Sequence, residues 1–200
     1  SDYNFEKQHL KLLELSKLKK IYTQNMNVYN EKIKPLPIGI ANSKWHHGNL
    51  SVWNEILSLK INKSNNIYFS FSINTNSKIR GDCYNKIVRK KIPFLKSRNY
   101  HKYLRILASY KYSICPEGNG IDTHRFWESL YLKVIPICKR NILVEYFSNY
   151  FPIFILDDWN DLNFGFLHNK YNDFNWENYQ KLNLDYYKKL LTNLNYNADN

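Results

Sequence analysis

The hydrophobic and polar positions follow different spacings near the start of the chain and in the rest of it. In residues 5–20 leucines recur at helical spacing, which predicts an amphipathic helix. Residues 32–40 form an extended apolar run broken by two prolines, which is typical of an edge strand or a linker. A second helix is predicted over residues 49–60. We interpret residues 1–65 as a partial N-terminal region joined through this proline-containing linker.

Beyond this region, short apolar runs alternate with helical patterns. Residues 66–73 alternate aromatic and small side chains, which predicts a strand. The remaining predicted elements are helices over 77–91 and 99–110, a strand over 112–115, a helix over 123–132, strands over 134–138 and 151–156, and a helical tail over 173–196. Short apolar strands separated by helices predict a parallel sheet covered on both faces. The expected fold class for residues 66–200 is therefore α/β, a Rossmann-like parallel sheet flanked by helices.

The composition and net charge of the chain limit the classes of binding partner but do not select one class. The formal net charge is +12, from 29 Lys and Arg against 17 Asp and Glu, which favours nucleic acids, acidic membranes, nucleotides or sugar phosphates. The basic residues form no long run, so most are assigned to solvated helix faces. No apolar run approaches the ~20 residues that span a bilayer, so no transmembrane segment is expected. Three cysteines without metal-type spacing predict a reducing, cytoplasmic location.

The sequence PEGNG at 116–120 contains two of the six glycines and predicts a phosphate-binding loop. It follows a predicted strand, at the edge of a parallel sheet where ligands bind. Glycines let backbone N–H groups approach an anion, and the next helix begins with free donors and partial positive charge. Arg125 can add charge-assisted contacts, and Glu128 can accept two ribose hydroxyls. The alternative is a tight strand-to-helix turn with Asp122 as a helix cap.

The stretch CPEGNGIDTHRFWESLYLKVIPI, residues 115–137, resembles the donor-binding segment of exostosin-like glycosyltransferases of the GT-B fold. The matching positions are Pro116, Gly118, Asp122, Arg125, Glu128 and the IPI run at 135–137. The resemblance covers roughly residues 65–165. Upstream, PIGIANSKWHHGN at 37–49 is similar to an interdomain segment of related proteins assigned as glycosyltransferases, many of them encoded by giant viruses.

This resemblance implies a viral enzyme that transfers a sugar from a nucleoside diphosphate sugar to a hydroxyl of a glycan or protein acceptor. It implies no metal, no other cofactor and no specific nucleic-acid partner, and the location could then be the host cytoplasm of an infected cell. The implied nucleotide-sugar contacts are Asn74, Thr75, Arg80, Glu117, Gly118, Asn119, Gly120, Thr123, His124, Arg125 and Glu128. The candidates for the catalytic base are Asp122, His47 and Glu117, with His46 beside His47.

Two other functions stay open at this point. One is a basic module that binds single-stranded nucleic acid through scattered Lys and Arg and through aromatic stacking. It predicts an affinity that falls steeply with salt, and it leaves the run PEGNGIDTHR unexplained. The other is a non-catalytic protein that binds a sugar nucleotide and works with a partner. It predicts nucleotide binding without turnover, because only a remnant of an N-terminal domain precedes residue 40.

Overall fold

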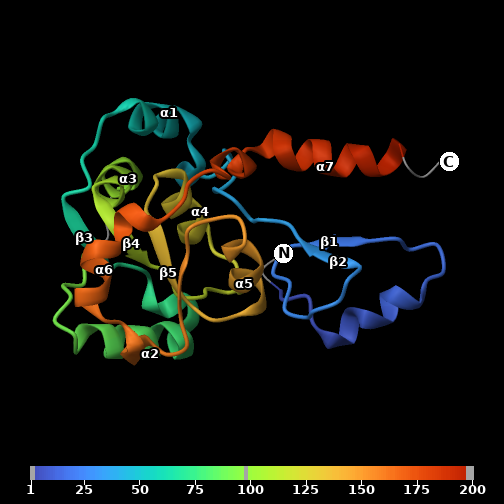
Figure 1. Ribbon diagram of the computed structural model, residues 1–200, viewed down its shortest axis with the longest axis horizontal. Helices are drawn as coiled ribbons and strands as arrows, with labels where there is room; N and C mark the ends of the chain where they lie inside the picture. The colour runs from blue at the N-terminus through green and yellow to red at the C-terminus, as the bar shows by residue number, and fades with distance from the viewer. Residues whose placement is uncertain (1–2, 97–98, 197–200) are drawn as a thin grey trace.

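A computed structural model describes residues 3–96 and 99–196, and its centre is a four-stranded, all-parallel sheet (Figure 1). The strands lie in the order β3 (Asn65–Tyr68), β4 (Tyr110–Ile114), β5 (Ile135–Lys139) and β6 (Phe154–Leu156). Their register places Tyr112 beside both Ile67 and Ile135. The parallel sheet predicted from the sequence is confirmed and is compatible with a Rossmann-like fold. The strand order follows the chain without a reversal.

Helices cover both faces of this sheet, as predicted. One face packs on α2 (Ser77–Val88), η4 (Trp159–Asp161) and α6 (Phe164–Lys170), and the other on α3 (Tyr100–Ala108), α4 (His124–Tyr131) and α5 (Ile142–Ser148), with α1 (Leu50–Ser58) outside α3. Phe69 and Tyr112 are fully buried on the first face, and Leu104 and Trp127 on the second. Side chains of the sheet therefore pack into separate hydrophobic cores on its two faces.

The strand predicted over 66–73 ends early, at Tyr68. The next backbone carbonyl accepts a hydrogen bond from the Leu95 N–H at 2.8 Å instead of pairing with β4. The carbonyls of Ser70 and Ser72 accept from arginine side chains at 2.6 and 2.9 Å. Because these groups turn away from the sheet, the chain beyond β3 forms an irregular wall instead of more strand.

Asparagine side chains cap many of the helices. The asparagines that accept a hydrogen bond from the first turn are Asn49 before α1, Asn76 before α2, Asn99 before α3, Asn141 before α5 and Asn163 before α6. Each such cap contributes about 1 kcal/mol. The prediction that Asp122 caps α4 is wrong, because the N-cap position is Thr123. Asp122 is instead buried against the indole N–H of Trp127.

The N-terminal part forms a second, smaller sheet, in which β1 (Ile21–Thr23) pairs in parallel with β2 (Ile33–Pro35). The helix predicted over 5–20 is only the 3-10 helix η1 (Lys7–Glu14), and no residue of it is fully buried. The short 3-10 helices elsewhere are η2 (His46–Gly48), η3 (Ile73–Asn76), η5 (Tyr171–Asp173) and η6 (Tyr179–Leu182). Figure 1 shows the small sheet beside α5, with the C-terminal helix α7 (Leu184–Tyr196) above it. The helix α1, grouped with the N-terminal region by sequence, packs on α3.

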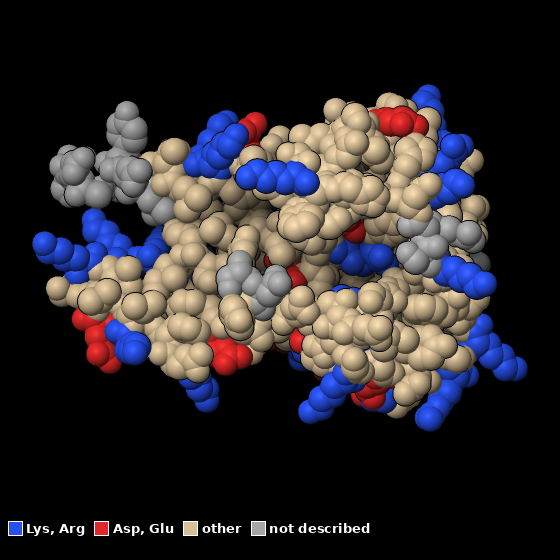
Figure 2. Space-filling model, turned by 180° about the vertical axis from the view of Figure 1, so that it is seen from behind, with Lys and Arg blue, Asp and Glu red and all other residues tan. Residues whose placement is uncertain are grey.

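The surface carries its charge in scattered positions. Figure 2 shows Lys and Arg side chains mostly at the margins of one face, separated by uncharged surface, with a few in a central hollow. Within residues 3–96 and 99–196, no helix is both long and apolar enough to cross a bilayer. Cys83, Cys115 and Cys138 are free and buried, and each packs as a small apolar side chain.

Candidate functional site

Two neighbouring cavities lie at the carboxyl edge of the sheet, where the sequence placed the site. The larger, which we call the arginine cavity, has a volume of about 560 Å³ and is lined by Arg125, His46, His47, two serines and five aromatic rings. The smaller, which we call the glutamate cavity, has a volume of about 250 Å³. Its polar lining consists of Glu117, Asp122, Thr123, Lys139, Arg140 and Asn141. The predicted site residues therefore divide between two cavities instead of converging on one.

Arg125, in the first turn of α4, is a cation held in place on the wall of the larger cavity. Its Nη1 donates to the Ser70 carbonyl at 2.6 Å, and its guanidinium carbon lies 4.5 Å from the ring centre of Tyr103 and 5.1 Å from that of Tyr68. Its Nε lies 3.7 Å from Glu128 and is buried without a hydrogen-bond partner in the described part of the chain. Burial lowers its pKa, but the two tyrosines and Glu128 outweigh burial, so the net pKa is raised.

Glu128 lies behind the arginine cavity and does not line it. One carboxylate oxygen accepts from the Tyr100 hydroxyl at 3.2 Å, and the other accepts from the Tyr103 hydroxyl. Tyr100 in turn accepts a hydrogen bond from the indole N–H of Trp53 at 3.0 Å. Burial, and then the charge of Glu128, raise the pKa of Tyr100, so its hydroxyl stays a donor. A ribose could reach this carboxylate only after both tyrosines had moved, so in this arrangement Glu128 anchors the tyrosines.

Two histidines on η2, His46 and His47, also line the arginine cavity. They are placed there by a sharp fold in the backbone at Gly48, where an added Cβ would lie 2.1 Å from the Asn42 carbonyl oxygen. Only glycine fits at that distance. The rings of His46 and His47 are both on the cavity lining. Of the three residues expected as catalytic bases, His47 is therefore the one that faces this cavity.

His124, expected to contact the nucleotide, has a different place. Its Nδ1 lies 2.7 Å from the Gly39 carbonyl oxygen, so it ties the linker before α1 to the start of α4. Its ring centre is 6.4 Å from that of His47, and it lines neither cavity. His124 therefore positions the linker from which His47 projects.

The glycine loop is filled by side chains of the same chain. A Cβ on Gly120 would lie 2.3 Å from Oδ1 of Asn25, and a Cβ on Gly118 would lie 2.9 Å from Nη2 of Arg80. The Asp122 N–H donates to Oδ1 of Asn25 at 2.8 Å, and the Gly118 N–H donates to the Gly120 carbonyl at 3.0 Å. These glycines let protein groups approach closely, and the N–H groups of Gly118 and Asp122 already donate to acceptors within the protein. The space over the two glycines, where the sequence predicted a phosphate, is thus taken by side chains of the protein.

Arg80 joins two loops at the sheet edge. Its Nε donates to the Glu117 carbonyl and its Nη1 to the Ser72 carbonyl, both at 2.9 Å. Burial first, and then the nearby Arg125, lower its pKa. Asn76, which the sequence did not single out, donates to the Gly118 carbonyl at 2.8 Å. The other expected contacts, Asn74, Thr75 and Asn119, are exposed and line neither cavity.

The glutamate cavity contains two carboxyl groups that accept hydrogen bonds from neighbouring residues. Glu117 accepts from the Asn141 side chain at 3.0 Å, and burial raises its pKa. Asp122 accepts from the Trp127 indole and from the Ile38 N–H, each at 2.7 Å. Burial raises the pKa of Asp122 to about 7 in spite of these hydrogen bonds. Both groups are better placed to hold loops together than to take a proton from a substrate in the larger cavity.

None of the five aromatic residues that line the arginine cavity was predicted from the sequence as a site residue. Tyr103 lies in the helix predicted over 99–110 and Tyr68 in the strand predicted over 66–73, yet both contact the guanidinium of Arg125. The signal that could have found them is a tyrosine in place of leucine or valine on a buried face, since a buried hydroxyl needs a partner. Within residues 3–96 and 99–196, no three or more His, Cys, Asp and Glu side chains are arranged to hold a metal ion.

No protein-family model matches the sequence, and no curated protein matches it either.

Proposed function

We propose that this chain binds a nucleoside diphosphate sugar in the arginine cavity, as the donor-binding part of a GT-B-type glycosyltransferase. The observation that carries the proposal is Arg125, a half-buried cation fixed on the wall of an open cavity at the carboxyl edge of a parallel sheet. Ligands of parallel α/β proteins bind at that edge. An arginine held by stacking and by a carbonyl suits the oxygens of a diphosphate.

The size and lining of the cavity support a nucleotide of this kind. Its volume of about 560 Å³ lies within the roughly 300–1,000 Å³ of small-molecule sites. Among the described residues, no Asp or Glu lines it, so a diphosphate would meet no like charge on the wall. Phe94 and Phe71 offer ring faces to a base, and Ser70 and Ser72 offer hydroxyls to a sugar. The smaller glutamate cavity, with two carboxyl groups on its lining, is a poorer match.

The proposed reaction uses His47 and Arg125, which both line the arginine cavity. His47 takes the proton of the acceptor hydroxyl as the acceptor oxygen bonds to the anomeric carbon of the sugar. The bond from that carbon to the diphosphate breaks at the same time, and the leaving oxygen keeps the bonding electrons. Arg125 stabilises the charge that develops on the diphosphate, so the proposed transfer needs no metal ion.

A non-catalytic sugar-nucleotide-binding protein is the second candidate. One observation favours it: two of the three residues expected as catalytic bases, Glu117 and Asp122, line the glutamate cavity and not the arginine cavity. In that case a partner would supply the acceptor side. The two functions share the donor site and differ only in turnover.

Calorimetric titration with UDP, GDP and ADP in the presence of EDTA tests the donor site. We expect one nucleoside diphosphate to bind, and Arg125→Gln to weaken it at least about tenfold through loss of a charge-assisted contact. The control is Arg105→Gln, because Arg105 is exposed on α3 and outside the cavity. Phe94→Ala removes an aromatic ring from the cavity lining and leaves the contacts of Glu128 in place. It is the second test variant, for use if Arg125→Gln does not fold.

Equal binding by the wild type and both cavity variants would contradict the proposal. Tight binding of single-stranded DNA without nucleotide binding would favour the nucleic-acid module instead. Hydrolysis of the donor sugar nucleotide then separates the two remaining functions. We expect His47→Gln to bind the nucleotide as the wild type does and to lose turnover, whereas a non-catalytic protein shows no turnover in either form.

A further inference from the structure

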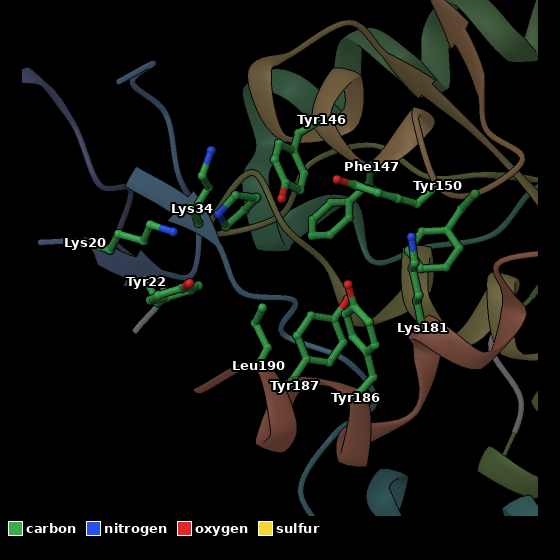
Figure 3. Close-up of a pocket in the computed structure, with 12 residues that line it drawn as sticks. Lys20, Tyr22, Lys34, Tyr146, Phe147, Tyr150, Lys181, Tyr186, Tyr187 and Leu190 are labelled. Atoms are coloured by element: carbon green, nitrogen blue, oxygen red, sulfur yellow. The ribbon is translucent and has the colours of Figure 1, made fainter. Parts of the chain in front are cut away.

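A third cavity lies away from the sheet edge, between the N-terminal sheet, α5 and the C-terminal helices (Figure 3). We call it the lysine–tyrosine pocket, because three lysines and five tyrosines make up most of its lining. Its volume is about 210 Å³. It shares no residue with the arginine cavity or the glutamate cavity. Three segments far apart in the sequence therefore build a separate concave site.

The charge of this pocket is positive. Lys20 and Lys34 stand on the side of the small sheet, and Lys181 comes from η6. The Lys181 ammonium lies 4.2 Å from the ring centre of Tyr150, which holds it at the pocket. Within the described part of the chain, none of the three ammonium groups forms an ion pair, and no Asp or Glu is on the lining. An anionic group entering the pocket would be the counter-charge that these lysines lack.

Phenol hydroxyls supply the hydrogen-bonding groups. Figure 3 shows the hydroxyls of Tyr146, Tyr186 and Tyr187 directed into the space between α5 and α7. Burial, and then neighbouring tyrosines, raise the pKa of Tyr146 and of Tyr187, so both phenols stay protonated. A protonated phenol can donate to an oxyanion and can also accept from a ligand hydroxyl. The pocket therefore offers both donors and acceptors beside positive charge.

The arrangement of the rings favours a sugar over a flat base. Tyr186 and Tyr187 lie at 88° to each other, Tyr146 and Phe147 at 87°, and Tyr146 and Tyr150 at 53°. Phe147 and Phe151, also on the lining, are tilted by 31° with ring centres 6.2 Å apart, too close for a base to lie between them. Single ring faces beside hydroxyls instead suit a sugar, which presents an apolar face and a rim of hydroxyls. The volume, below the roughly 300 Å³ of drug-sized sites, suits one ring.

We propose that the lysine–tyrosine pocket binds one sugar ring that carries a phosphate or carboxylate group. The anionic group contacts Lys181 and the phenol hydroxyls, and the ring lies against the aromatic side chains. Lysine suits this role because its ammonium is a point charge that meets an oxyanion from several directions. The proposal goes beyond sugar transfer and does not depend on it, since the pocket is built from other residues than the donor site.

Calorimetric titration of the whole chain with glucose 6-phosphate, glucuronate, glucose and inorganic phosphate tests this proposal. We expect one of the two anionic sugars to bind about tenfold or more tightly than glucose or phosphate, since it uses both parts of the pocket. Lys181→Gln should weaken that ligand about tenfold. The matched control is Lys170→Gln, because the Lys170 ammonium also lies 4.2 Å from a ring centre, that of Phe166, outside the pocket.

A second variant guards against loss of folding. Tyr187→Phe removes one hydroxyl and keeps the ring, and we expect it to weaken the anionic sugar severalfold with an unchanged circular dichroism spectrum. An affinity that Lys181→Gln lowers no more than Lys170→Gln does would overturn the proposal. So would equal affinity for inorganic phosphate and the anionic sugars. A Lys181-dependent affinity that is greater for adenosine monophosphate than for glucose 6-phosphate would make the pocket a base site.

Discussion

The glycine loop and the arginine cavity lie at the same edge of the same sheet, and only one of them is open. The loop at 116–120 carries the stronger sequence signal, yet Asn25 and Arg80 fill the space that its glycines leave. The cavity carries a weaker signal, His47 and Arg125 far apart in the sequence, yet it has a volume of about 560 Å³. The difference teaches that a glycine reports a close approach of some group without saying which group approaches.

Asn25 makes this point most directly. It lies 95 residues before Gly120, and its backbone has a φ of 51°, in the left-handed region that asparagine tolerates better than most residues. Its side chain occupies the position over Gly120 that a phosphate oxygen was expected to take. The side-chain amide oxygen of Asn25 is an uncharged acceptor for the Asp122 N–H. The hydrogen-bond acceptor at a glycine loop can thus be a side chain of the protein itself instead of a phosphate.

The largest expected effect on stability comes from removing the charge of Arg125 beside the arginine cavity. Arg125→Met leaves the buried Glu128 carboxylate without its cation, and loss of one partner of a buried pair costs about 3–5 kcal/mol. We expect the free energy of unfolding, measured in urea, to fall by about 3 kcal/mol. The double variant Arg125→Met with Glu128→Gln should be less destabilised than the sum of the two single variants. Strict additivity would contradict the pairing.

The next effect tests what the glycine loop contacts. Gly120→Ala places a methyl group 2.3 Å from Oδ1 of Asn25, and overpacking of this kind costs about 1–3 kcal/mol. We expect Asn25→Gly, which keeps the left-handed backbone and removes the amide, to restore part of the lost stability in the double variant. If Gly120→Ala costs the same with and without the Asn25 side chain, the close approach is not the reason for the glycine.

The pH dependence of stability tests the buried end of the same loop. The pKa of Asp122 is raised from 3.8 to about 7, so between these values the folded chain holds a proton that the unfolded chain has released. Stability from this group therefore falls as pH rises through that window, by up to about 1.4 kcal/mol per pH unit. We expect Asp122→Asn to flatten this slope in urea unfolding. A slope unchanged by the substitution would show that Asp122 titrates normally.

The smallest effect is expected at the other glycine of the loop. A methyl group on Gly118 would lie 2.9 Å from Nη2 of Arg80, the far end of a flexible side chain. We expect Gly118→Ala to cost about 1 kcal/mol or less, since the guanidinium can shift. Measured side by side in urea, Gly118→Ala should be milder than Gly120→Ala. The reverse order would contradict the packing described for the two glycines.

The sequence predicted most of the sheet and the helices around it, because these depend on local periodicity. The strand over 134–138 and the helix over 123–132 were placed within a residue or two of β5 and α4. The chain beyond Tyr68 could not be predicted, since two of its carbonyls accept hydrogen bonds from Leu95 and Arg125, which are distant in the sequence. Local pattern carries no information about such long-range partners.

The site was predictable only in part, for the same reason. His47 and Arg125 were both singled out, and both line the arginine cavity. Glu128 was also singled out, but its contacts with Tyr100 and Tyr103 depend on how α3 packs against α4. Burial decides whether a carboxylate faces a ligand or its own neighbours, and burial is a property of the folded chain.

Hydrogen exchange measured with and without the bound nucleoside diphosphate is the most direct test of where the donor binds. We predict slower exchange of backbone amides at 68–73, on the wall of the arginine cavity, and no change at Gly118 and Asp122, whose N–H groups already have partners in the protein. Protection confined to 116–122 would contradict this account, because the nucleotide would then have displaced Asn25 and bound the glycine loop.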